Sequence, residues 1–180
     1  FRVIAMDNRG HGRSGKPVGA EYYGDEMIND AVRLLDHLGI EKAHVVGYSM
    51  GGYITAKMAT MYPERMLSAT IGGAGWAKAA SIREKTLNEL AESLDEEGSY
   101  RPLMGRLAGS EGPMKELEVW LIDAFMQLGR DEEVLASVAR GMTRHTVTEE
   151  EIKAIDISVQ LVCGSEDPLI KAAEKWVAVR

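Results

Sequence analysis

The sequence has 180 residues, of which 45% are hydrophobic and 27% are charged, and its net charge is −7. A chain of this length can bury the core of one domain, and its negative charge argues against nucleic-acid and anionic-membrane partners and favours a small-molecule partner. The single cysteine, Cys163, excludes an internal disulfide, and its apolar surroundings predict a buried, inert thiol. No apolar run approaches about 18 residues and no signal-peptide pattern opens the chain, so we expect a cytoplasmic protein.

The first part of the sequence alternates short apolar runs with amphipathic segments. Residues 2–6 predict a buried strand, because the run is apolar and ends at the breaker-rich stretch DNRGHGRSGKPVGA. Residues 21–38 carry apolar positions at helical spacing and stop at a glycine. A strand at 43–48, a helix that ends before Pro63 and a strand at 67–73 follow. This rhythm predicts the α/β class, with a mostly parallel sheet and right-handed crossovers.

The alternation then stops, because the pattern is helical from about residue 77 to 150. We interpret 77–150 as a helical insertion in the sheet. A capping box at Thr148 starts a short helix, and strand character returns at 159–164 before a last helical stretch. The prediction is therefore a partial core of about four strands, with a first part at 1–76 and a late strand and helix at 151–180.

One serine stands out in the stretch HVVGYSMGGYIT, where Ser49 is the centre of a G-x-S-x-G pattern. The motif follows an apolar strand run and precedes a helix, which is the setting that a nucleophilic serine needs. Small neighbours leave room for a sharp, strained turn. The helix start would direct free N–H groups, that of Met50 first, at a substrate oxyanion. The structural alternative is a tight turn in which Ser49 only caps the helix.

A competing motif lies in the first loop, where GHGRSG matches the G-x-G-x-x-G pattern of dinucleotide sites. That pattern must open a helix whose N-terminus binds the pyrophosphate, whereas here Pro17 and Gly19 continue the loop. We therefore predict no nucleotide site. The sequence also contains no phosphate loop of the G-K-[ST] type and no histidine pair at metal-ligand spacing.

Three segments together resemble the α/β-hydrolase family, in the branch with a helical cap: VIAMDNRGHGRS, HVVGYSMGG and VQLVCGSEDPL. The resemblance implies that Ser49 is the nucleophile, that the Met50 backbone N–H donates to the oxyanion, and that Asp167 orients the catalytic histidine. Asp167 also lies just past a predicted strand end, where parallel sheets place their sites. Glu166 remains a competitor for this role, and SEDP can also be an acidic turn before a helix.

The base of such a triad is missing from the expected place, because no histidine follows Asp167. Four histidines precede it: His11, His37, His44 and His145. Each has a structural explanation, although a substitute role for His145 or His11 stays open. We expect instead that the histidine lies beyond Arg180 and that earlier strands precede Phe1, so that this chain is an internal fragment with little activity alone.

The resemblance implies a serine hydrolase that acts on a carboxylic ester or related acyl substrate, without cofactor or metal. Lactone hydrolysis, carbon–carbon bond cleavage beside a ketone, and a non-catalytic ligand-binding module of the same fold stay open. Candidate substrate-pocket residues are the aromatic and methionine side chains Trp76, Trp120, Phe125, Met126 and Met142. The alternative for each of them is core packing.

Overall fold

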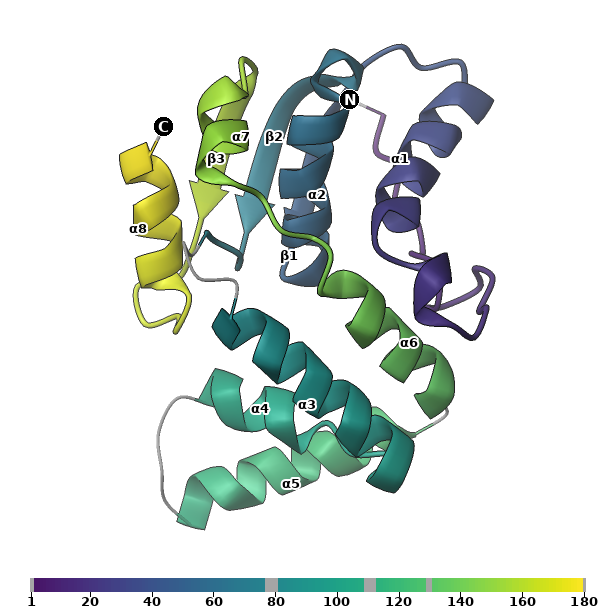
Figure 1. Cartoon of the computed structure of the whole chain (residues 1–180), viewed down its shortest axis with the longest axis vertical. Helices are drawn as coiled ribbons and strands as arrows, with labels where there is room; N and C mark the ends of the chain where they lie inside the picture. The colour runs from purple at the N-terminus through teal and green to yellow at the C-terminus, as the bar shows by residue number, and fades with distance from the viewer. Residues whose placement is uncertain (1, 77–80, 109–112, 129–130, 180) are drawn as a thin grey trace. The chain divides into compact units, whose positions relative to one another are not determined.

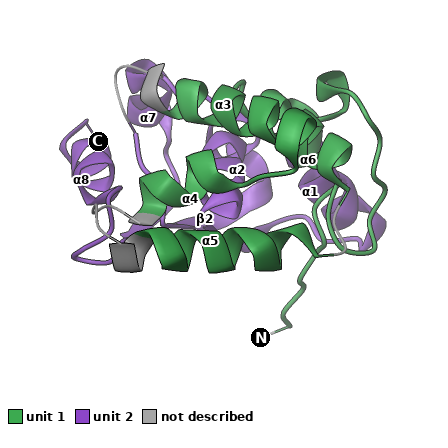
Figure 2. Ribbon diagram, turned by 90° about the horizontal axis from the view of Figure 1, so that it is seen from below, with its two compact units in different colours: residues 1–27, 83–144 green, residues 28–82, 145–180 purple. Residues whose placement is uncertain are grey.

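The computed structural model groups the chain in two compact units, each built from two stretches of sequence (Figures 1 and 2). The residues that it describes are 2–76, 81–108, 113–128 and 131–179. Residues 28–82 and 145–180 form a unit that contains the β-sheet, which we call the sheet unit. Residues 1–27 and 83–144 form the other, which we call the helical unit.

The sheet unit has three parallel strands in the order β1-β2-β3. The strands are β1 (Ala43–Tyr48), β2 (Met66–Gly72) and β3 (Ser158–Val162). The helices are α1 (Asp25–His37, whose first turn falls in the helical unit), α2 (Met50–Met61), η2 (Pro63–Arg65), α7 (Glu149–Ala154) and α8 (Ile170–Val179). Tyr48 pairs with Gly72 and Gly72 with Val162, so the three strands end in one row. The predicted α/β class and these three strands are confirmed.

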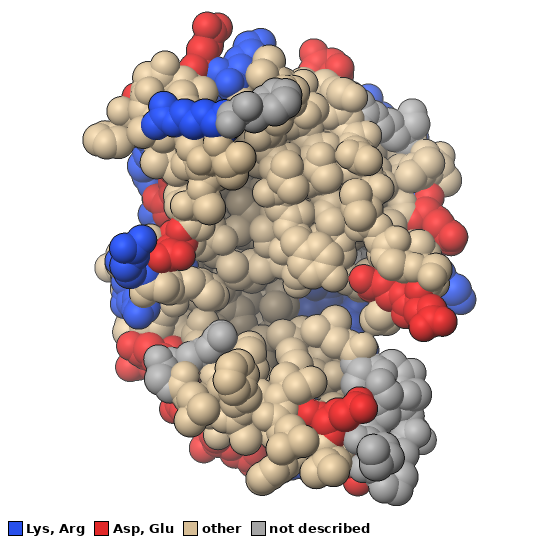
Figure 3. Space-filling view, turned by 180° about the vertical axis from the view of Figure 1, so that it is seen from behind, with Lys and Arg blue, Asp and Glu red and all other residues tan. Residues whose placement is uncertain are grey.

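The two faces of the sheet are covered differently. α2 and α7 lie on one face, where Ala69 and Ile71 of β2 are fully buried (Figure 1). On the other face Val46 and Tyr48 of β1 are 74% and 73% exposed. Seen from behind, this open face of the sheet is a broad area with few charged side chains (Figure 3). The described strands therefore bury one side of the sheet only.

The predicted strand at residues 2–6 is wrong. These residues form no strand, and Val3 is among the most exposed apolar side chains of the described chain. An apolar run becomes a strand only where a neighbouring strand completes its hydrogen bonds, and residues 2–6 pair with no described strand. The sheet therefore has three described strands instead of about four.

Helix α7 begins with the predicted capping box and is also bound to α2. Thr148 Oγ1 accepts the Glu151 N–H (3.1 Å) and Glu151 Oε2 accepts the Thr148 N–H (2.7 Å), which confirms the capping box. Glu151 also forms an ion pair with Lys57 of α2 at 2.8 Å. Partial burial alone would raise the pKa of Glu151, but the bonds and charge supplied by Lys57 and Thr148 outweigh it and lower that pKa.

The helical unit packs its first loop against its last helix. Its helices are η1 (Ala20–Tyr22), α3 (Ser81–Glu97, of which 83–97 belong to this unit), α4 (Arg101–Ala108), α5 (Pro113–Gln127) and α6 (Glu132–Met142). The Gly19 N–H donates to Ser137 Oγ of α6 (3.0 Å), and a Cβ on Gly141 would lie 2.3 Å from the Tyr23 side chain. This packing explains why residues 1–27 group with the helices. The division into core, cap and late core at residues 76 and 150 stays a prediction, and residues 77–80 of the cap lie outside the described chain.

Candidate active site

Ser49 occupies a sharp turn between β1 and α2 in the sheet unit. Its backbone has φ 52° and ψ −113°, and it is the one non-glycine residue with positive φ among the described residues. The Ser49 N–H donates to the Gly72 carbonyl at the end of β2 (2.8 Å), which anchors the turn to the neighbouring strand. Such a conformation costs on the order of 1–3 kcal/mol and persists only where its surroundings hold it.

The glycines around Ser49 have unequal steric roles. A Cβ on Gly47 would lie 2.0 Å from the Gly51 carbonyl oxygen, so no side chain fits there. A Cβ on Gly52 would lie 2.7 Å from the Gly72 carbonyl oxygen. A Cβ on Gly51 would meet nothing within 4 Å. The steric reason expected for the glycines of the motif therefore holds at Gly47, whereas on the helix side it applies to Gly52 and not to Gly51.

The Ser49 side chain is exposed and does not cap α2. Among the described residues its hydroxyl makes no hydrogen bond, which contradicts the alternative that Ser49 is an N-cap. The helix begins at Met50, whose N–H has no acceptor within the helix because it belongs to the first turn. A free hydroxyl thus lies next to an N–H group at the positive end of a helix.

Asp167 lies in the turn between β3 and α8. Its N–H donates to the Gly164 carbonyl (3.1 Å), and its Oδ1 accepts the Leu169 N–H (2.8 Å). The side chain is half-buried and fixed from one side, whereas its competitor Glu166 is exposed. Burial first, and then the charge of Asp167 and a hydrogen bond to it, raise the pKa of the neighbouring Cys163 thiol. The thiol is half-buried, so the prediction that it is buried is wrong, but with its raised pKa it stays protonated at neutral pH, as expected of an inert thiol.

Ser49 and the Asp167 turn belong to the same edge of the sheet. The Ser49 N–H bonds to the Gly72 carbonyl, and in the next step the Gly73 N–H bonds to the Val162 carbonyl (3.0 Å). These two bonds form one row across the carboxyl ends of the three strands. Because neighbouring strands lie about 4.8 Å apart, the ends of β1 and β3 are about 10 Å apart.

The four histidines are dispersed. His44 lies at the other end of β1, roughly 16 Å along the strand from Ser49, and its Nδ1 is hydrogen-bonded to Ser68 Oγ (2.7 Å). His37 ends α1, His145 is buried before α7, and His11 belongs to the helical unit. Within the described chain no hydrogen bond joins any of them to Ser49. The structure therefore assigns no base from these residues.

The candidate pocket residues have three different environments. Trp76 is buried in the sheet unit, where its indole N–H donates to the Val147 carbonyl (2.8 Å). Trp120 and Phe125 of α5 are 54% and 71% exposed, so core packing does not explain them. Met142 is buried in α6, as core packing requires. A pocket role for Trp76, Trp120 and Phe125 stays a prediction.

Other kinds of site find no support in the described residues. The loop around Gly10 closes on itself, with the Gly10 N–H bonded to the Gly15 carbonyl (2.8 Å), and no helix starts directly after it. No three His, Cys, Asp or Glu side chains of the described chain are grouped so as to hold a metal ion. In the same ranges, each helix is too short or too polar to cross a membrane.

Comparison with known proteins identifies the class to which this fold and this turn belong. The chain matches the alpha/beta hydrolase fold family over residues 1–109 and is a member of it. It is 32% identical to 3-oxoadipate enol-lactonase 2 of Acinetobacter baylyi, over 97% of the chain and 64% of that protein. It is 45% identical to the putative carbamate hydrolase RutD of Azorhizobium caulinodans, over 43% of the chain and 29% of that protein.

A solved structure shows the same fold. The thermophilic esterase of Thermogutta terrifontis aligns with a TM-score of 0.70 at 24% identity, over 96% of the chain and 64% of the esterase. The chain thus spans less than two thirds of the length of each of these relatives, which are hydrolases.

Proposed function

We propose that the protein is a serine hydrolase that cleaves carboxylic esters or lactones by acyl transfer. The observation that carries the proposal is the conformation of Ser49, which has a strained backbone and an exposed hydroxyl in the turn between β1 and α2. A protein retains a strained non-glycine residue of this kind where the strain has a use. The turn serves a nucleophile, because it presents the hydroxyl beside an unpaired helix N–H.

In the proposed reaction the Ser49 oxygen attacks the substrate carbonyl carbon, and the Met50 N–H donates to the oxyanion that forms. A histidine removes the serine proton and returns it to the leaving alcohol, and water then releases the acyl group by the same two steps. Asp167 holds the imidazole, because the Leu169 N–H fixes one carboxylate oxygen and a carboxylate has further lone pairs with which to accept from the ring. An imidazole between the ends of β1 and β3 can bond to both side chains.

The substrate class follows from the chemistry of the site and from its relatives. The carbonyl of an ester or a lactone accepts the same attack, and the relative aligned over 97% of the chain is an enol-lactonase. We propose a small neutral or weakly charged acyl substrate, with no nucleic-acid or membrane partner and no cofactor. Carbon–carbon bond cleavage beside a ketone is the alternative, and it would appear in the assay described next as a labelled Ser49 without turnover of the ester or the lactone.

The test uses the whole protein that carries this chain, treated with a fluorophosphonate that labels activated serines. We expect labelling of the wild type and complete loss of labelling in Ser49→Ala, whose turnover of a p-nitrophenyl ester or an aryl lactone falls by roughly 10⁴-fold or more. Ser158→Ala is the matched control, because Ser158 is an exposed serine at the far end of β3, and it should label normally. Labelling that persists in Ser49→Ala, or a wild type that is not labelled, would overturn the proposal.

A further inference from the structure

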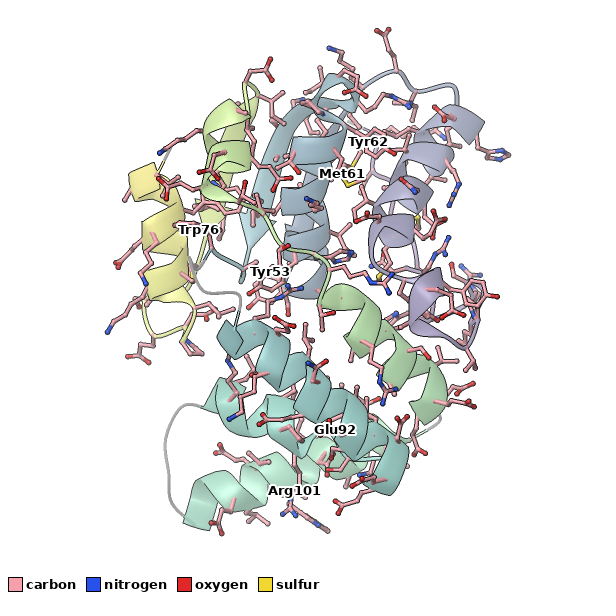
Figure 4. All side chains as sticks on the ribbon, in the orientation of Figure 1. Tyr53, Met61, Tyr62, Trp76, Glu92 and Arg101 are labelled. Atoms are coloured by element: carbon pink, nitrogen blue, oxygen red, sulfur yellow. The ribbon has the colours of Figure 1, made fainter. Side chains whose placement is uncertain are left out.

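Trp76 is buried, and its backbone N–H and its indole N–H are both hydrogen-bonded. Its backbone N–H donates to the Ala172 carbonyl in the first turn of α8 (3.0 Å). Its indole N–H donates to the Val147 carbonyl in the segment that leads into α7 (2.8 Å). All three residues belong to the sheet unit, and Figure 4 labels Trp76 there. The backbone N–H and the indole N–H of Trp76 are thus both used inside the sheet unit.

The bond to Ala172 links Trp76 to the helix turn that holds the predicted acid, Asp167. The peptide group that accepts from Trp76 joins Ala172 to Ala173, and its N–H, that of Ala173, donates to the Leu169 carbonyl (3.0 Å). The Leu169 N–H in turn donates to Asp167 Oδ1 (2.8 Å). These hydrogen bonds therefore connect Trp76, through the first turn of α8, to Leu169, the residue whose N–H holds the Asp167 carboxylate.

The segment that ends in Trp76 also holds the nucleophile. It begins at Gly72, whose carbonyl accepts the Ser49 N–H, and continues through Gly73, whose N–H bonds to Val162. Gly75 packs against α8 so closely that a Cβ there would lie 2.5 Å from the Ala172 carbonyl carbon. One short run, residues 72–76, therefore contacts the Ser49 turn at its start and, at its end, the first turn of α8, which directly follows the Asp167 turn.

We propose that Trp76 is a positioning residue that fixes the spacing between Ser49 and Asp167. The proposal rests on the proposed function, because it assigns these two residues to one reaction. At one end of residues 72–76, the Gly72 carbonyl holds the Ser49 turn. The indole, held by Val147, keeps the other end of the run against α8 and thereby holds the Asp167 carboxylate in place. In this role, which differs from the predicted pocket role, Trp76 acts through Asp167.

The test replaces Trp76 by Phe in the whole protein, which keeps an aromatic side chain and removes the indole N–H. Trp176→Phe is the matched control, since Trp176 is also buried in the same unit but its indole N–H has no acceptor among the described residues. For Trp76→Phe we expect kcat to fall roughly tenfold with KM changed less than about twofold, as for a misplaced catalytic group. We also expect the acid limb of the kcat–pH profile to move to lower pH, because a displaced carboxylate stabilises the imidazolium less.

A structural readout separates this proposal from the proposed function. Amide hydrogen exchange over residues 167–173 should be faster in Trp76→Phe than in the wild type and unchanged in Trp176→Phe. That result would support the positioning role even if Ser49 proved inactive. If Trp76→Phe does not fold, replacement of Trp76 by 3-benzothienylalanine, which keeps the shape and lacks the N–H, provides the same comparison. Equal effects of the two Phe variants, or an unchanged kcat, pH profile and exchange in Trp76→Phe, would overturn it.

Discussion

The ends of β1 and β3 carry the two predicted catalytic side chains, and they are held by different forces. At the end of β1, Ser49 has a strained backbone and a hydroxyl that is free of hydrogen bonds within the described chain. At the end of β3, Asp167 lies in an ordinary turn and its carboxylate accepts a backbone N–H. Steric exclusion thus shapes the nucleophile side, and hydrogen bonding shapes the acid side.

This difference fits the two tasks. A nucleophile must present an unbonded oxygen to the substrate, so its position is set through the backbone, by close packing that only glycine allows at Gly47 and Gly52. An orienting acid must keep one direction for its carboxylate, so a bond to the side chain itself is useful. The two ends should therefore respond differently to substitution, which the predictions below test.

The largest effect is expected at Gly47, because an added methyl group meets rigid backbone. A Cβ there would lie 2.0 Å from the Gly51 carbonyl oxygen and 2.4 Å from Oγ1 of the buried Thr55. We expect Gly47→Ala to lower the free energy of unfolding by about 3 kcal/mol, the upper range for overpacking. Urea titration followed by circular dichroism measures the change.

Gly51→Ala is the matched control for Gly47→Ala, since a Cβ at Gly51 has open space and the residue lies in the first turn of α2. Its free energy of unfolding should stay equal or rise by about 0.5 kcal/mol, because alanine favours helices. If both variants lose the same stability, steric exclusion does not explain the turn.

The contrast between Gly47 and Gly51 also shows how much of the site can be predicted from the sequence. The strand, turn and helix around Ser49 could be predicted, because apolar run, glycines and helical spacing are all local signals. The sequence could not predict which of the glycines has no space for a side chain, since the atoms that crowd Gly52 belong to Gly72 and Ala74 at the end of the neighbouring strand. The sequence therefore predicts the candidate site residues, but it does not predict the residues that pack against them and hold them in place.

The strand predicted at residues 2–6 failed for a related reason. Its signal equals that of β1, yet β1 pairs with β2 and residues 2–6 pair with no described strand. The hydrogen bonds of Trp76 likewise could not be predicted, because they join it to Val147 and Ala172, about 70 and 96 residues further along the chain. Long-range partners decide these cases, and a single sequence does not display them.

The second effect concerns the strain at Ser49. At φ 52° and ψ −113° glycine avoids the strain that any residue with a Cβ must bear. We expect the free energy of unfolding of Ser49→Gly to be about 1 kcal/mol higher than that of Ser49→Ala. This difference is the backbone strain that glycine relieves, reduced by the greater chain entropy of glycine in the unfolded state. Both variants lack the hydroxyl, so the comparison isolates the backbone. Equal stability of the two variants would show that the turn is not strained.

The smallest effect is expected at the other strand end, where a hydrogen bond holds Asp167. Asp167→Ala removes the acceptor of the Leu169 N–H and should cost about 1 kcal/mol in free energy of unfolding, as for a lost helix cap. Asp167→Asn keeps an oxygen in the same place, so its stability should stay within about 0.5 kcal/mol of the wild type, although it supports the imidazole tautomer poorly and should lower kcat sharply. Urea titration of both variants with the esterase assay distinguishes the two roles of this side chain. If Asn were as destabilising as Ala, the charge of Asp167, and not its bond to Leu169, would hold the turn, and the contrast between the two strand ends would be one of electrostatics.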